Sequence, residues 1–125
     1  MTQWIRDRSL SRAPWAAYPG LLGTDISGAL DRPTYNLQKR CWNSYQTWNY
    51  DYDARPEGPL PRQRLAVFAD AVGRSYLLTD APIEVGPEVG IRLESRFTGT
   101  MLSQRLYVYR LDPTSRAARA LPNCR

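Results

Sequence analysis

The sequence predicts a small α+β domain, and three features of the chain lead to that prediction. In the C-terminal half, apolar and polar residues alternate at 91–97 and 105–111, as in strands with one wet face. Within residues 34–52 and 62–73, apolar residues recur at helical spacing. Prolines and glycines interrupt residues 1–33. We therefore expect one aromatic amphipathic helix, a candidate second helix, a small antiparallel sheet and a long extended N-terminal arm.

A chain of 125 residues has room for one hydrophobic core. We divide it into an extended N-terminal arm at 1–33, a single α+β domain at 34–111 and a C-terminal tail at 112–125. Terminal segments fray unless something holds them, and Trp and Tyr are frequent anchors at interfaces. We therefore expect the aromatic residues of the arm to contact a partner, and these are Trp4, Trp15 and Tyr18.

Residues 32–56 form the most distinctive segment, with six of the fourteen aromatic residues and one of the two cysteines. Its aromatics at Trp42, Tyr45, Trp48 and Tyr52 are spaced by three, three and four residues, which places them on one face of a helix. Thr34 follows Pro33 and is a suitable N-cap. The stripe would either pack on the chain's own core or dock on a partner, and the pattern leaves both open.

A second helix is predicted over residues 62–73, directly after Pro61. Apolar side chains recur there at helical spacing, and Gly73 occupies a C-cap position. The alternation at 65, 67 and 69 also suits a strand. The preceding segment 51–61, with three acidic residues, three prolines and a glycine, is typical of a linker that ends the aromatic helix.

The C-terminal half predicts a β-hairpin. Ile91, Leu93 and Phe97 alternate with charged residues on the first strand. On the second strand, Tyr107 and Tyr109 share one face, while the leucine and valine between them share the other. Residues 74–80 and 83–85 are candidates for further strands of the same sheet.

The chain contains no histidine, which removes the commonest general base and the commonest metal ligand. We expect no catalytic residue, no metal and no cofactor, so the chain is not predicted to be an enzyme. The acidic residues of segment 51–61 lack the ligand number and spacing of a calcium loop. Cys41 and Cys124 either form one disulfide across a long loop or remain two thiols.

The net charge of +5 comes from sixteen arginines and a single lysine, Lys39. A coding bias explains such a ratio, but guanidinium groups also suit bidentate contacts at interfaces. The arginines are dispersed, so nucleic acid is not the expected partner. No run of about 18 apolar residues is present, and we expect no transmembrane segment.

One local motif resembles a known family. In NLQKRCWNSY, Asn36 precedes the pair Cys41 and Trp42, and Tyr45 follows three residues later. With the Asp-Arg-Pro before it, the stretch 31–45 resembles the first helix of subunit VIb of cytochrome c oxidase. That family's twin cysteine arrangement is absent from this chain. The resemblance implies a peripheral, non-catalytic subunit on the intermembrane-space side of the mitochondrial inner membrane.

The function expected from these observations is that of a structural or accessory subunit of a large multiprotein assembly, most concretely a mitochondrial respiratory-chain complex. Its partners would be other protein subunits, and no small-molecule substrate is evident. The alternatives are a stand-alone secreted or periplasmic binding or immunity module held by one disulfide, and a virion or phage-tail structural protein.

Overall fold

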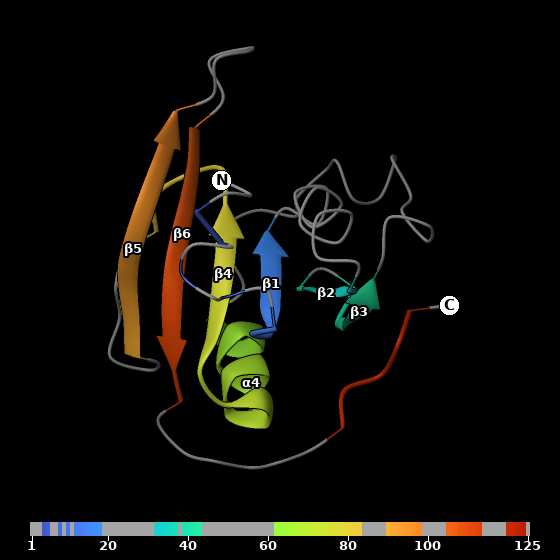
Figure 1. Ribbon diagram of the computed structural model, residues 1–125. Coiled ribbons are helices and arrows are strands. Elements are labelled where there is room, and N and C mark those ends of the chain that lie inside the picture. Colours follow the sequence, from blue (N-terminus) through green and yellow to red (C-terminus); the bar gives the residue numbers. More distant parts are fainter. Residues whose placement is uncertain are drawn as a thin grey trace.

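A computed structural model of the chain describes residues 4, 5, 8, 10, 12–18, 32–37, 39–43, 62–83, 90–98, 105–113 and 120–124 (Figure 1). Its main element is a six-stranded sheet, with one helix of eleven residues against it. From one edge to the other the strands are β3 (Cys41–Asn43), β2 (Thr34–Asn36), β1 (Trp15–Tyr18), β4 (Ser75–Thr79), β6 (Arg105–Asp112) and β5 (Gly90–Thr98).

The sheet is mixed, so the expected small antiparallel sheet is wrong. β1 runs parallel to both of its neighbours, β2 and β4, whereas the β2–β3, β4–β6 and β5–β6 pairs are antiparallel. The expected arm is also wrong at residues 15–18, because they form this inner strand and all four are buried. The apolar run 15–18 between two prolines is too short to show a period. The sequence pattern therefore could not identify it as a strand buried on both faces.

The expected aromatic helix is wrong in its first half. Thr34–Asn36 and Cys41–Asn43 are paired strands, and Asn43, which a helix would have turned to water, is buried. Threonine, tyrosine, cysteine and tryptophan suit a pleated strand at least as well as a helix. In addition, the Asn36 side chain accepts a hydrogen bond from the Lys39 amide, and such local bonds compete with helix formation. The remainder of the expected helix, 44–52, lies outside the described residues.

Other predicted elements are confirmed. The second helix is α4 (Arg62–Val72), and Gly73 follows it with a φ of 85° while donating its amide to the Ala69 carbonyl at 2.8 Å. Residues 75–79 form β4, and β5 and β6 form the predicted hairpin. Tyr107 and Tyr109 do share one face of β6, opposite Leu106 and Val108.

Apolar side chains fill both faces of the sheet. α4 covers one face near β1 and β4 (Figure 1). The buried residues on that side are Ala16, Tyr18, Tyr35, Leu37, Leu65, Phe68, Ala69, Leu77, Ile91, Tyr109 and Leu111. The N-terminal residues cover the other face, where the cluster consists of Ile5, Trp15, Ala17, Tyr76, Leu78 and Val108, with Trp4, Leu10, Ala13, Phe97 and Leu106 packed against it.

A β-bulge in β5 changes which residues of that strand share a face. The register with β6 shifts between Leu93 and Ser95. As a result Ile91 packs under the helix, whereas Phe97 packs in the opposite cluster. Strict alternation predicts that Ile91 and Phe97 share one face of the sheet. The extra residue of the bulge moves the side chains after it to the opposite face.

Replacing Trp15 by alanine tests whether the N-terminal region belongs to the core. The Trp15 side chain is 1% exposed, stacks on Tyr76 at 5.3 Å and donates its indole N–H to the Leu10 carbonyl at 3.1 Å. Trp15→Ala should therefore lower the free energy of unfolding in urea by about 3–5 kcal/mol. The control Leu93→Ala removes a side chain that is 45% exposed and should change it by less than about 1 kcal/mol. Equal effects of the two substitutions would contradict this placement.

Candidate binding site

Two hydrogen bonds to Asn36 close the turn of the β2–β3 hairpin. The Asn36 carbonyl accepts a hydrogen bond from the Arg40 amide at 2.8 Å, and the Asn36 side-chain oxygen accepts one from the Lys39 amide at 3.1 Å. Arg40 closes the loop with a φ of 58°, the left-handed conformation that glycine and asparagine adopt most readily. Among the described residues, it alone adopts a positive φ without being glycine.

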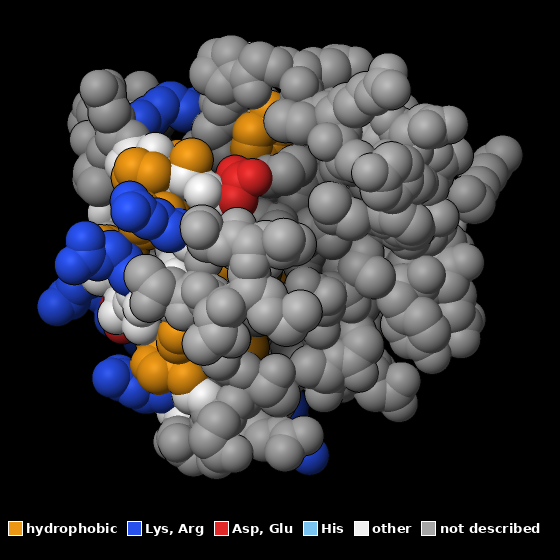
Figure 2. Space-filling view, turned by 90° about the horizontal axis from the view of Figure 1, so that it is seen from above, with side chains coloured by type: hydrophobic (Ala, Val, Ile, Leu, Met, Phe, Trp, Pro, Cys, Tyr) orange, Lys and Arg blue, Asp and Glu red, His pale blue; other side chains and the backbone are white. Residues whose placement is uncertain are grey.

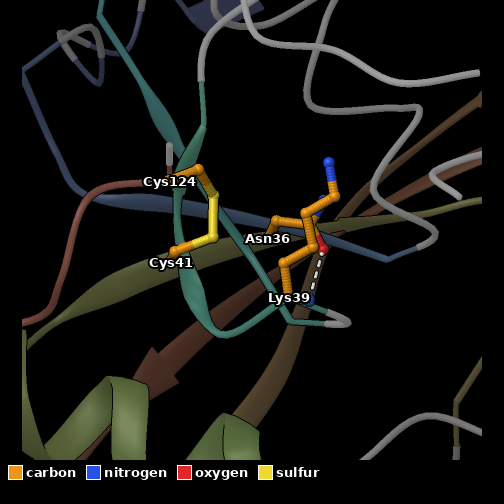
Figure 3. The surroundings of a disulfide bond; sticks show 4 residues. All are labelled: Asn36, Lys39, Cys41 and Cys124. Carbon is orange, nitrogen blue, oxygen red and sulfur yellow. Dashed lines mark hydrogen bonds between the residues drawn. A yellow bond between two sulfur atoms is a disulfide. The ribbon is translucent and has the colours of Figure 1, made fainter.

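The hairpin is fastened to the C-terminal segment by a disulfide between Cys41 and Cys124 (Figure 3). The Cα atoms of the two cysteines lie 5.0 Å apart, and 83 positions separate them in the sequence. Backbone hydrogen bonds reinforce the link, because Trp42 donates its amide to the Pro122 carbonyl at 2.9 Å and accepts the Cys124 amide at 2.8 Å. Of the two cysteine states that the sequence left open, the structure has the bonded one.

Three aromatic rings join the hairpin to the helix. Tyr35 of β2 stacks on Phe68 of α4 with ring centroids 4.9 Å apart. Trp42 of β3 meets both rings edge-on, at 5.5 Å from Tyr35 and 5.7 Å from Phe68. Such pairs add roughly 1 kcal/mol each beyond the area that they bury. The hairpin is therefore held on one side by the disulfide and on the other by this aromatic cluster.

A pocket of about 360 Å³ opens beside this cluster. Two basic side chains of the described residues line it, Arg40 from the hairpin loop and Arg64 from the first turns of α4. The Arg64 guanidinium donates to the Leu37 carbonyl at 3.1 Å, which fixes the helix against the hairpin loop. The other described lining residues are Tyr35, Gln63 and Val67.

The pKa of the Tyr35 phenol depends on its burial and on the two arginines that line the pocket. Burial raises the pKa of Tyr35 above its ordinary value, and the positive charges of Arg40 and Arg64 act in the opposite direction. At neutral pH the phenol is therefore protonated and can donate a hydrogen bond, while two cations lie close to it.

The residues predicted to bind a partner lie in different environments. Trp15 and Tyr18 are buried in the chain's own core, on opposite faces of β1. Trp4 is half-buried, where its ring meets Phe97 at 5.7 Å and the Arg8 guanidinium at 5.4 Å. Trp42 belongs to the aromatic cluster. The other three predicted contacts, Tyr45, Trp48 and Tyr52, lie outside the described residues.

The sequence reading missed the pocket itself. It placed Trp42 in an aromatic stripe, and it assigned no role to Arg40, Tyr35 or Arg64. One signal was available, because Arg64 directly precedes the apolar stripe of α4 and so had to lie at the rim of the buried helix face. What brings it to the hairpin is the sheet order, which no local pattern encodes.

Exposed arginines of the described residues also gather on the β5 side of the molecule (Figure 2). They belong to the hairpin of β5 and β6 and are Arg92, Arg96 and Arg105. Glu94 lies 3.8 Å from Arg110 across the hairpin, and Asp112 lies 3.2 Å from the same guanidinium. Charged side chains and the bulge in β5 are both features that protect an exposed sheet edge from pairing with another chain.

No family model matches the chain, and no curated protein or solved structure matches it. Within the described ranges, no helix is long and apolar enough to span a membrane, and no three acidic, histidine or cysteine side chains are placed to hold a metal ion. The hairpin, its disulfide and its pocket are therefore the features from which a function can be inferred.

The pKa of Tyr35 provides a test of this geometry. Burial raises the pKa of Tyr35, so the neutral phenol contributes to the free energy of unfolding below its unfolded-state pKa of about 10. That stabilising contribution is lost as the pH rises through the folded-state pKa. Stability should therefore fall more steeply above pH ~10 in the native sequence than in Tyr35→Phe.

Replacing Arg40 by glycine removes a nearby cation and should move the Tyr35 titration to higher pH. The titration is followed by absorbance at 295 nm, with the Tyr35→Phe variant subtracted as background.

The control for that titration is Arg92→Gln, because three strands separate β5 from β2 in the sheet. It should leave the Tyr35 titration in place. A shift of equal size in both variants would show that the titration responds to net charge and not to the pocket.

Proposed function

We propose that this chain is a non-catalytic binding module that works outside the reducing cytosol. The observation that carries the proposal is the Cys41–Cys124 disulfide, which joins the β2–β3 hairpin to the C-terminal segment. Disulfides persist in oxidising compartments and are rare where glutathione and thioredoxin keep thiols reduced. Among the readings of the sequence, this favours the secreted or periplasmic module.

Two further observations support a module that folds on its own. Trp15 and Tyr18, two of the three aromatic residues expected to dock an extended arm on another subunit, are buried within this chain. Apolar clusters of the described residues fill both faces of the sheet, which supports a core that is completed within the chain. The absence of histidine from the sequence supports binding over catalysis.

The second candidate is the accessory subunit of a large assembly, and the specific observation in its favour is the surface around Trp4. That ring is half-buried beside Arg8, and aromatic and arginine side chains are enriched at protein interfaces. The resemblance to subunit VIb, however, implies that Asn36, Cys41 and Trp42 lie in a helix, and these residues lie in strands. A respiratory-chain assembly is therefore the weaker of the two proposals.

The purified, oxidised chain should be a monomer by light scattering and should unfold in a single cooperative transition. Cys41→Ser combined with Cys124→Ser should lower the free energy of unfolding by roughly 4 kcal/mol, because the bond closes a long loop in the unfolded chain. Reductant should have the same effect on the native sequence and none on the double variant.

Two results would contradict the proposal. One is a chain that becomes soluble and folded only together with a second protein, which would instead support the accessory subunit. The other is a pair of free thiols in the native extract, shown by trapping with an alkylating reagent before lysis.

A further inference from the structure

We propose that the pocket between the β2–β3 hairpin and α4 binds the phosphate group of a small phosphate monoester, held by Arg40, Arg64 and the Tyr35 hydroxyl. The sequence reading identified no small-molecule ligand, and the proposed binding function does not require one. The inference therefore goes beyond that function and stands or fails separately from it.

The dimensions of the pocket suit a small ligand. Its volume of about 360 Å³ is within the range of roughly 300–1,000 Å³ found for small-molecule sites. The lining provides guanidinium and phenol donors, the Gln63 amide and the partly exposed apolar side chain of Val67. Donors thus converge at one place, with an apolar flank for the organic part of the ligand.

The charge of the lining selects the class of ligand. Among the described lining residues two are cationic and none is acidic. A phosphate monoester carries a charge of about −1.5 to −2 at pH 7 and presents three acceptor oxygens. A guanidinium presents paired donors that match phosphate geometry. Two guanidiniums and a protonated phenol therefore match a phosphate better than a singly charged carboxylate.

The backbone of Arg40 is an independent observation that supports the site. Its left-handed conformation is one that a long side chain adopts at a cost, and glycine fulfils the same role after α4, at Gly73. No hydrogen bond or ion pair to another described side chain is found for the exposed Arg40 guanidinium. Strained residues of this kind cluster at functional sites. Its side chain lines the pocket, which gives the residue a reason to be arginine.

The test is calorimetric titration of the oxidised full-length chain in 150 mM salt with phenyl phosphate, inorganic phosphate and benzoate. Phenyl phosphate should bind, inorganic phosphate should bind more weakly because it lacks the apolar part, and benzoate should bind at least tenfold more weakly than phenyl phosphate. Arg40→Gly should weaken phenyl phosphate binding by about 10- to 100-fold, the usual effect of losing a charge-assisted contact. Its melting temperature should not fall, because glycine accepts the loop conformation without strain.

Two further variants complete the design. Arg64→Lys keeps the charge but loses the paired donors, and it should weaken binding by a smaller factor than Arg40→Gly. Arg92→Gln removes an exposed arginine at the far edge of the sheet and should leave binding unchanged. An equal loss in Arg92→Gln would mean general attraction to a basic chain and would overturn the site.

Three other outcomes would also overturn the proposal. The first is the absence of binding by either phosphate compound at millimolar concentration. The second is benzoate binding as tightly as phenyl phosphate, which would assign the pocket to carboxylates. The third is a lower melting temperature for Arg40→Gly with unchanged phenyl phosphate affinity, which would make Arg40 a structural residue of the loop.

Discussion

The rest of the fold depends on the burial of β1 on both faces. All four of its residues pair with β4, and Ala16 and Ala17 pair with β2 on the other side; both pairings are parallel. Successive side chains alternate between the cluster under α4 and the cluster under the N-terminal residues. The two small residues Ala16 and Ala17 let both layers approach the sheet closely. Within the described part of the sheet, β1 is what joins the β2–β3 hairpin to the three-stranded unit of β4, β6 and β5.

Elements defined by neighbouring residues were predictable from the sequence, whereas elements defined by contacts between distant segments were not. The helix at 62–73 and the hairpin at 91–111 were predictable, because their patterns are local and long enough to show a period. β1 was not, because four apolar residues carry no period and its pairing joins segments about twenty and sixty residues apart. The aromatic spacing at 42, 45, 48 and 52 fits a helix, yet residue 42 is in a strand. Spacing alone could not detect the loop that Asn36 stabilises or the disulfide that follows it.

The disulfide addresses a weakness that every open sheet shares. β3 is at one edge and exposes backbone groups that would otherwise be able to pair with another chain. Trp42 meets Asn123 in a parallel bridge there, and the covalent bond keeps the C-terminal segment along β3. The other edge, β5, has no such cover among the described residues and is instead interrupted by a bulge and lined with arginines. The two edges are thus protected by different means, and only one of them depends on redox conditions.

The same hairpin positions the pocket, and this explains why the site could not be recognised from the sequence. Arg40 and Arg64 are far apart along the chain, and their positions have different causes. Arg40 closes the hairpin loop, whereas Arg64 lies at the rim of the buried face of α4 and donates to the Leu37 carbonyl. They meet because Tyr35 stacks on Phe68, which sets the hairpin against α4. The disulfide limits how far β3 can move away from that contact. If the pocket binds a phosphate as proposed, its affinity depends on the disulfide, because reduction would remove the covalent link that holds the hairpin carrying Arg40 while leaving α4 and Arg64 in place.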